Sequence, residues 1–204
     1  GATVNIGVEY SLQAGSTTAA DGGGIARTKY GAGYGLGVKA AMGGLTLGVY
    51  AAERENDQTV IAGEDDVKNE FNGTWFANYS FGPVSIGYST SYVDAGLAGS
   101  AEATTNAKTV GTSAGIFESE AMSIAFNVND NLSVSYSETE DVYNAQDNAS
   151  TAVADVTMDI ESLQVAYSMG SMSIKAYKTE TNNPNFKSDA DSRTVTEVAL
   201  GLAF

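Results

Sequence analysis

The sequence predicts an all-β fold in which antiparallel strands follow one another up and down in a single sheet. Apolar residues recur at every second position in about ten segments, the spacing of a strand with two different faces. Short turns alternate with long polar connections along the chain. The 204 residues contain no apolar run of about 18 residues, so no transmembrane helix is expected.

The apolar positions of each predicted strand share one face, and small or polar residues occupy the other face. In the first segment the apolar residues are Val4, Ile6, Val8, Tyr10 and Leu12. The same alternation recurs in the segments 30–42, 45–49, 71–81, 84–92, 122–128, 132–136, 163–169, 172–176 and 198–204.

The connections are of two kinds. Long polar ones are expected at 14–26, 56–67, 94–114, 143–155 and 182–192. The others are two-residue hairpin turns, in which Gly, Asn and Asp accept a positive φ; they are Gly43-Gly44, Gly82-Pro83, Asp130-Asn131 and Gly170-Ser171. Outer-membrane barrels have short periplasmic turns and long external loops, so both chain ends are expected on the periplasmic side.

One segment, 156–170, departs from the simple alternation. Met158 and Ile160 fall on the opposite parity to Leu163 and Val165. A bulge near Glu161 and Ser162 would restore the faces, because one inserted residue reverses them. Alternatively, the outer part of this strand lies above the bilayer, and the sequence leaves both explanations open.

Three features favour a transmembrane β-barrel over a soluble β-sandwich. Aromatic residues gather toward strand ends, as in the girdles at membrane interfaces; they are Tyr79 and Phe81 at one turn, and Tyr10, Tyr88, Tyr92 and Tyr136 farther out. The face opposite the apolar one is small and polar rather than charged. All connections are consistent with adjacent hairpins, which suits an up-and-down meander.

Composition argues against several classes of function. Lys and Arg number 10 against 25 Asp and Glu, giving a formal net charge of −15, so no basic patch for nucleic acid is expected. The chain has no His and no Cys, which removes the commonest general base and all thiol chemistry. Composition leaves hydrolysis by a carboxylate pair open, but Glu53, Glu55, Glu118 and Glu120 lie near predicted loops, where charge is usually solvated. We expect no enzymatic activity, no catalytic residue, no cofactor and no resident metal.

The candidate functional residues are charged side chains on the inward parity. Charges in a lumen bias which ions enter, whereas ion pairs along the wall would leave transport unaffected, and both interpretations stand. The residues predicted to line the pore are Glu9, Lys29, Lys39, Arg54, Glu70 and Lys175.

Three acidic clusters are expected near the external rim: Glu64-Asp65-Asp66, Glu138 with Glu140-Asp141, and Asp189 with Asp191. Carboxylates bind hard divalent cations and could bridge through them to lipopolysaccharide. None has the spacing of a calcium loop, so a solvated rim is the favoured interpretation.

The end of the sequence carries a family resemblance. Val198, Leu200, Leu202 and Phe204 alternate up to a terminal Phe, which resembles the signature that the barrel-assembly machinery recognises in outer-membrane proteins. With this strand, the segments 123–136 and 163–170 are similar in style to Gram-negative general porins, especially the trimeric alphaproteobacterial type.

The resemblance implies a barrel of about sixteen strands in the bacterial cell outer membrane. It also implies a homotrimer, contact with the lipid bilayer and lipopolysaccharide, and passive diffusion of small hydrophilic solutes and ions. An inward-folded third external loop forms the constriction in that family, and no residue here can be matched to it. A structural or adhesive barrel, with a closed pore and partner-binding loops, is the alternative function.

The inward positions are mostly Gly, Ser and Ala, which would underfill a ring of only ten strands. The segment 1–204 is therefore expected to be a single barrel domain or its C-terminal portion, within a wall of more than ten strands, with further strands expected before Gly1.

Overall fold

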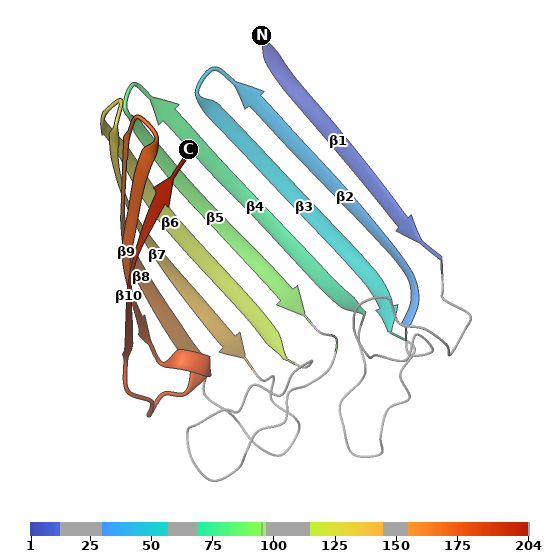
Figure 1. Cartoon of the computed structure of the whole chain (residues 1–204). Coiled ribbons are helices and arrows are strands. Elements are labelled where there is room, and N and C mark those ends of the chain that lie inside the picture. Colours follow the sequence, from blue (N-terminus) through green and yellow to red (C-terminus); the bar gives the residue numbers. More distant parts are fainter. Residues whose placement is uncertain (13–29, 57–68, 95, 97–114, 145–154, 204) are drawn as a thin grey trace.

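The computed structural model of the chain describes residues 1–12, 30–56, 69–94, 96, 115–144 and 155–203. Within them, ten antiparallel strands form one sheet, and neighbours in the sheet are neighbours in sequence (Figure 1). The predicted all-β, up-and-down fold is thereby confirmed. The strands are β1 Ala2–Ser11, β2 Tyr30–Met42, β3 Leu45–Asn56, β4 Glu70–Phe81, β5 Val84–Asp94, β6 Ile116–Asn129, β7 Leu132–Asn144, β8 Val156–Met169, β9 Met172–Asn182 and β10 Arg193–Leu202.

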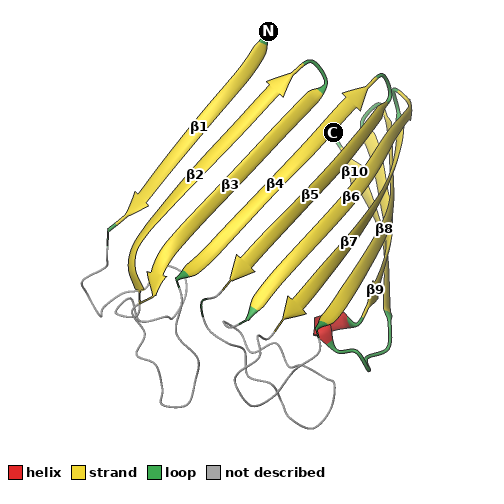
Figure 2. Cartoon of the chain, turned by 180° about the vertical axis from the view of Figure 1, so that it is seen from behind, coloured by secondary structure: helices red, strands yellow, loops and turns green. Residues whose placement is uncertain are grey.

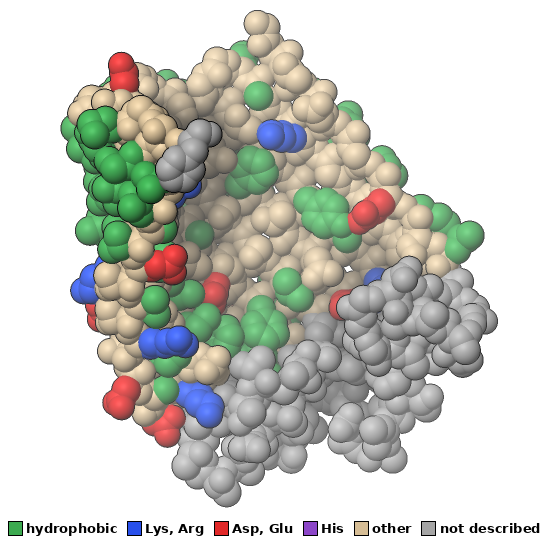
Figure 3. Space-filling model, in the orientation of Figure 1, with side chains coloured by type: hydrophobic (Ala, Val, Ile, Leu, Met, Phe, Trp, Pro, Cys, Tyr) green, Lys and Arg blue, Asp and Glu red, His purple; other side chains and the backbone are tan. Residues whose placement is uncertain are grey.

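The sheet has one apolar face and one face of small and polar residues. Directly paired residues share a face, and the apolar pairs Ile6–Val38 and Val49–Trp75 show that the alternation is in register between strands. We call this apolar side the outward face and the opposite side the inner face. Figure 3 looks onto the concave inner face, where tan backbone and polar groups predominate, while green side chains gather on the last strands at the left.

The outward face has no protein layer over it among the described residues. Ile6 is 69% exposed and Val198 is 68% exposed, although both belong to its apolar stripe. Within the described ranges, buried apolar side chains are confined to one small cluster of Tyr143, Val156 and Phe186. A β-sandwich would bury such a face against a second sheet, and the described residues form only one sheet.

The four two-residue turns lie where the sequence predicts them. Gly43, Gly82 and Gly170 have φ of 58°, 53° and 59°, as expected for the first position of a hairpin turn that requires Gly. The fourth turn, Asp130-Asn131, uses no positive φ. Instead, the Asn129 side chain accepts hydrogen bonds from the backbone N–H groups of Asn131 and Leu132, at 2.9 and 3.0 Å.

The strands are staggered along the sheet, as in a barrel wall. Met42 lies beside its turn and pairs with Leu45, which pairs with Tyr79. The same row continues through Ile124 and reaches Lys178 in the middle of β9. Figure 2 shows the resulting tilt from behind.

The ten strands do not close into a ring. Among the described residues, β1 pairs only with β2, and β10 pairs only with β9. The two edges stand apart in Figure 1. This is the arrangement that the expectation of a wider wall requires, because a closed ring of ten would join these two strands.

Of the two explanations left open for the segment 156–170, the bulge is absent. The pairing of β7 with β8 runs without a shift from Leu132–Tyr167 to Tyr143–Val156. Met158 and Ile160 therefore face inward, where Met158 packs against the buried cluster. The parity reverses because the strand exchanges its apolar side near the outer end, rather than because a residue is inserted.

The connection predicted at 182–192 contains a short 3-10 helix, η2, at Pro184–Phe186. Positive φ values at Asn183, Asn185 and Phe186 fold it back so that Phe186 is buried against the sheet. In the described part of the chain, no helix is long and apolar enough to cross a membrane. The long connections predicted at 14–26, 56–67, 94–114 and 143–155 lie largely outside the described residues.

Candidate functional site: the inner face of the sheet

Small residues dominate the inner face of most strands. The pleat alternates them with the outward apolar residues, so each strand contributes one set to each face. Direct pairs such as Gly7–Gly37, Ser91–Ser119 and Ser137–Ser162 continue this pattern across the sheet. Outside the buried cluster of Tyr143, Val156 and Phe186, the inner face therefore consists mainly of small and polar groups.

Five of the six residues predicted to line the pore lie on this inner face. Glu9 pairs with Gly35, Lys39 with Gly48, and Lys175 with Ala199. Arg54 pairs directly with Glu70, and the two form an ion pair in which Arg54 Nε donates to Glu70 Oε2 at 2.7 Å. Lys29 lies outside the described residues.

Glu9 is linked to an aromatic residue that parity alone does not identify. The Tyr50 hydroxyl donates a hydrogen bond to Glu9 Oε1 across β2. Two glycines of β2 make room for this contact: the Glu9 side chain lies over Gly35, and the Tyr50 ring lies beside Gly37. The carboxylate is thus held toward β3 instead of extending freely from the inner face.

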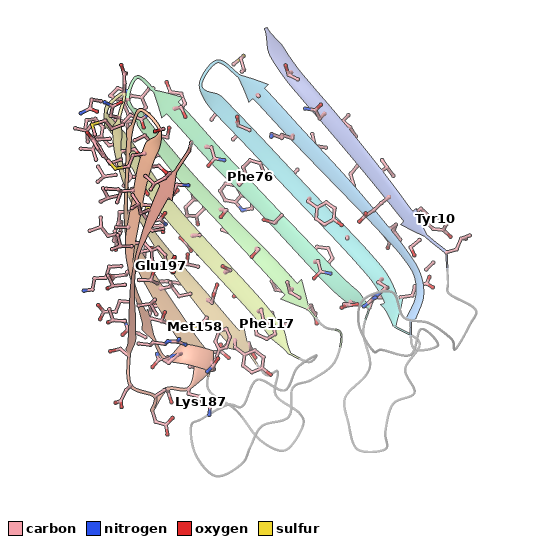
Figure 4. The ribbon with its side chains drawn as sticks, in the orientation of Figure 1. Tyr10, Phe76, Phe117, Met158, Lys187 and Glu197 are labelled. Atoms are coloured by element: carbon pink, nitrogen blue, oxygen red, sulfur yellow. The ribbon has the colours of Figure 1, made fainter. Side chains whose placement is uncertain are left out.

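Phe76, like Tyr50, lies against a glycine of the neighbouring strand, in the adjacent row of inner-face residues. It pairs directly with Gly48, and its ring occupies the space that a side chain at Gly48 would need. Figure 4 labels Phe76 on the concave side of the sheet. A hollow of about 380 Å³ lies beside it, and the inner-face residues that line it are Asn5, Gly7, Gly37, Lys39, Gly48, Tyr50, Thr74 and Phe76.

A second tyrosine–carboxylate pair stands at the far edge of the sheet. Tyr177 and Glu197 are directly paired on the inner face of β9 and β10. The Tyr177 hydroxyl donates to Glu197 Oε2 at 2.8 Å. In both pairs a phenol holds a carboxylate against the sheet, which limits how far that charge extends from the inner face.

An aromatic cluster occupies the inner face at the outer ends of β6, β7 and β8. The rings of Phe117 and Tyr143 lie 4.7 Å apart, and Phe186 of η2 contacts both at 5.7 and 5.8 Å. Figure 4 shows Phe117 and Met158 close to η2. This cluster anchors η2 over the outer end of the sheet.

Several glutamates that the sequence places near loops lie within strands on the outward face. Glu120, Glu140 and Asp159 are direct cross-strand neighbours, and Glu138, Glu161 and Glu180 form the adjacent row. Asp141, by contrast, faces inward opposite Met158. The predicted cluster of Glu138, Glu140 and Asp141 is thus divided between two faces.

The other acidic clusters show no convergence within the described residues. Asp189 and Asp191 are exposed, and the segment 64–66 lies outside the described residues. Nowhere in the described ranges do three or more acidic side chains come together in a way that could hold a metal ion.

The structure describes three of the four residues of the predicted assembly signal. Val198 and Leu200 pair with Ala176 and Ile174 on the outward face of β10, and Leu202 pairs with Met172. Phe204 lies outside the described residues. The role of this strand in assembly stays a prediction.

Sequence inspection missed Tyr50, Phe76 and Tyr177 because it searched the inward parity for charge. The available signal was an aromatic residue on the otherwise small, polar parity of its own strand. Which glycine or carboxylate each ring meets depends on the strand register, which alternation does not specify.

Comparison with models of known protein families and with curated proteins found no match to this chain.

Proposed function

We propose that the chain forms wall strands of a water-filled porin in the bacterial outer membrane. Small hydrophilic solutes and ions would diffuse through it passively. The observation that carries the proposal is a single sheet whose convex face is apolar and exposed and whose concave face is small and polar. Lipid would cover the first face and water the second, so neither face would need a protein layer.

The distribution of outward side chains supports a bilayer position. Apolar residues occupy the outward face, with aromatic contacts near both of its ends: Tyr79–Phe81 at 5.5 Å beside a short turn and Phe71–Tyr92 at 6.0 Å toward the long connections. Carboxylates follow on β6 to β9, toward the long connections. This order is that of an apolar band bounded by an aromatic girdle and then by a polar exterior.

The open edges support a wall of more than ten strands. Every residue of β1 is exposed, and its free backbone groups would be unpaired at membrane depth, where no water compensates them. Further strands would close the wall, to about sixteen by resemblance to general porins. The same resemblance supports a homotrimer, lipopolysaccharide contact and insertion by the barrel-assembly machinery.

No chemical step is part of the proposal. The inner face carries a mixed set of charges held by neighbours, as in Arg54 with Glu70 and Tyr177 with Glu197. Such groups shape the local field for passing ions. We accordingly assign no catalytic role to any residue.

Single-channel recording of the full-length protein in planar lipid bilayers tests the proposal. A porin gives steady, stepwise conductance that scales with salt concentration. Insertion without conductance would contradict the proposal and favour the adhesive barrel with a closed pore. A protein that remains monodisperse in water without detergent would contradict the membrane position itself.

A further inference from the structure

We propose that the hollow between β1 and β4 is a binding subsite for an anionic monosaccharide, with the sugar ring on Phe76 and its carboxylate or phosphate at Lys39. The assignment of this subsite to a permeation path rests on the proposed function. Binding itself requires only the folded inner wall.

The floor of the subsite is backbone. Gly7 and Gly37 pair directly across β1 and β2, whereas Gly48 of β3 lies in the adjacent inner-face row, where it pairs with Lys39. These three glycines are among the residues that line the hollow of about 380 Å³. That volume falls within the range of small-molecule sites and suits a single sugar ring.

Phe76 and Tyr50 flank this floor with flat apolar surfaces. The Phe76 ring rests over Gly48, and the Tyr50 ring lies beside Gly37. Phe76 is only partly exposed, so it is held in place and binding immobilises little additional side chain. The C–H face of a pyranose is complementary to an aromatic surface of this kind.

The polar groups around the hollow define what the ligand must offer. The Tyr50 hydroxyl donates its proton to Glu9, and Thr74 Oγ1 donates to the Thr90 carbonyl at 2.9 Å. Both oxygens therefore face a ligand as acceptors, and a sugar hydroxyl is the complementary donor. Asn5, opposite Lys39 in the register, can serve as donor or acceptor.

Lys39 supplies the charge preference. It is exposed, and it is the one formally charged residue among those lining the hollow. A carboxylate or phosphate on the sugar would form a charge-assisted hydrogen bond with its ammonium group. A neutral sugar would lack that bond, and acetate would lack the ring contact.

Binding of glucuronate to the full-length protein in detergent, measured by calorimetry, tests the inference. Wild-type protein should bind glucuronate at least about tenfold more tightly than glucose or acetate, which corresponds to loss of one charge-assisted bond. Lys39→Met should remove this advantage over glucose. Phe76→Leu, which keeps apolar bulk over Gly48, should weaken glucuronate and glucose alike.

The matched control is Lys178→Met, which removes the same charge from the outward face. It should leave glucuronate binding unchanged. Equal affinity for glucuronate, glucose and acetate would overturn the inference, as would equal weakening by Lys39→Met and Lys178→Met. In that case Phe76 and Tyr50 serve only to pack over cross-strand glycines.

The binding assay separates this inference from the porin proposal. Selective glucuronate binding in a protein that conducts no current would retain the subsite and reject the porin. Conductance without selective binding would reject the subsite and retain the porin.

Discussion

The two glycines of the first hairpin turn are both required, for different reasons. Gly43 has a φ of 58° with open space where a side chain would project. Gly44 has no such backbone requirement, but a Cβ there would run into the Ser80 carbonyl oxygen of β4. The Ser80 N–H also donates to the Gly44 carbonyl at 2.9 Å, which holds the two strands close.

Alanine substitutions at these two positions should therefore differ in cost. Gly43→Ala should lower the free energy of unfolding by about 1 kcal/mol, the cost of a left-handed residue with a side chain. Gly44→Ala should cost more, because backbone atoms of β3 and β4 must separate. Urea unfolding of the protein in lipid vesicles measures both values. A Gly44→Ala variant as stable as wild type would contradict the close approach.

At this scale the sequence predicts the face of a residue better than its contacts. Parity correctly assigns Glu9 and Lys175 to the small, polar face, because the pleat fixes alternation within each strand. It does not show that Glu9 is bound by Tyr50, which lies two strands away. That contact depends on the register and on glycines in the intervening strand.

The outer halves of β6 to β9 place like charges side by side on the outward face. Glu140 lies directly between Glu120 and Asp159. Lys178 offsets little of this charge, since it is exposed and stands 4.0 Å from Glu180. Directly opposed like charges destabilise a sheet, and they would not tolerate burial in hydrocarbon.

Removing the central charge should stabilise the protein. Glu140→Gln should raise the free energy of unfolding by roughly a few tenths of a kcal/mol at low salt, and the gain should fade as salt screens the repulsion. Glu197→Gln is the matched control, because Glu197 pairs with Tyr177 and has no acidic residue directly opposite. A loss of stability in Glu140→Gln, or an equal gain in the control, would contradict this account.

The sequence predicts the strands themselves better than it predicts the contacts at their outer ends. Alternation predicts β1 to β10 because each has two different environments. In β8 the alternation reverses at Met158 and Ile160, which face inward, and Met158 packs against the inner cluster that includes Phe186 of η2. That contact joins residues of β8 and η2 that are not neighbours in sequence, so local periodicity alone could not distinguish a bulge from a reversal of the apolar side.

Over the molecule as a whole, charge is distributed unevenly between the inner face and the rest of the chain. In the described strands the inner face carries four carboxylates, on Glu9, Glu70, Asp141 and Glu197, and four basic groups, on Lys39, Arg54, Lys175 and Arg193. The formal net charge of −15 therefore resides elsewhere in the chain. Selectivity should then arise mainly from the field at the mouth rather than from the wall.

The proposed channel should prefer cations over anions. The negative charge outside the inner wall raises the local cation concentration within a screening length of about 8 Å at physiological ionic strength. The reversal potential in a salt gradient measures this preference, which should weaken toward 1 M salt, where the screening length falls to about 3 Å. Anion selectivity at low salt would contradict the prediction.

The sequence predicts the topology of the sheet better than it predicts whether the sheet closes. Turn chemistry and alternation together predict an antiparallel meander, because each hairpin is local. Whether the outermost strands meet depends on how many strands share the wall, and this number is not encoded in any one hairpin. The small inward residues, together with the resemblance to porins of about sixteen strands, indicated that β1 and β10 would not pair.

The central claim is that water lies on the inner face of this sheet and lipid on the outward face. The chain contains no Cys, so single cysteines along β6 can be tested without background, using a water-soluble thiol reagent on the protein in lipid vesicles. Cysteine at Ser123 or Ala125, on the inner face, should react. Cysteine at Ile124 or Phe126, on the outward face, should be protected. Protection at all four positions would indicate a dry, closed interior, equal reaction at all four would indicate a sheet outside the membrane, and either result would contradict the account.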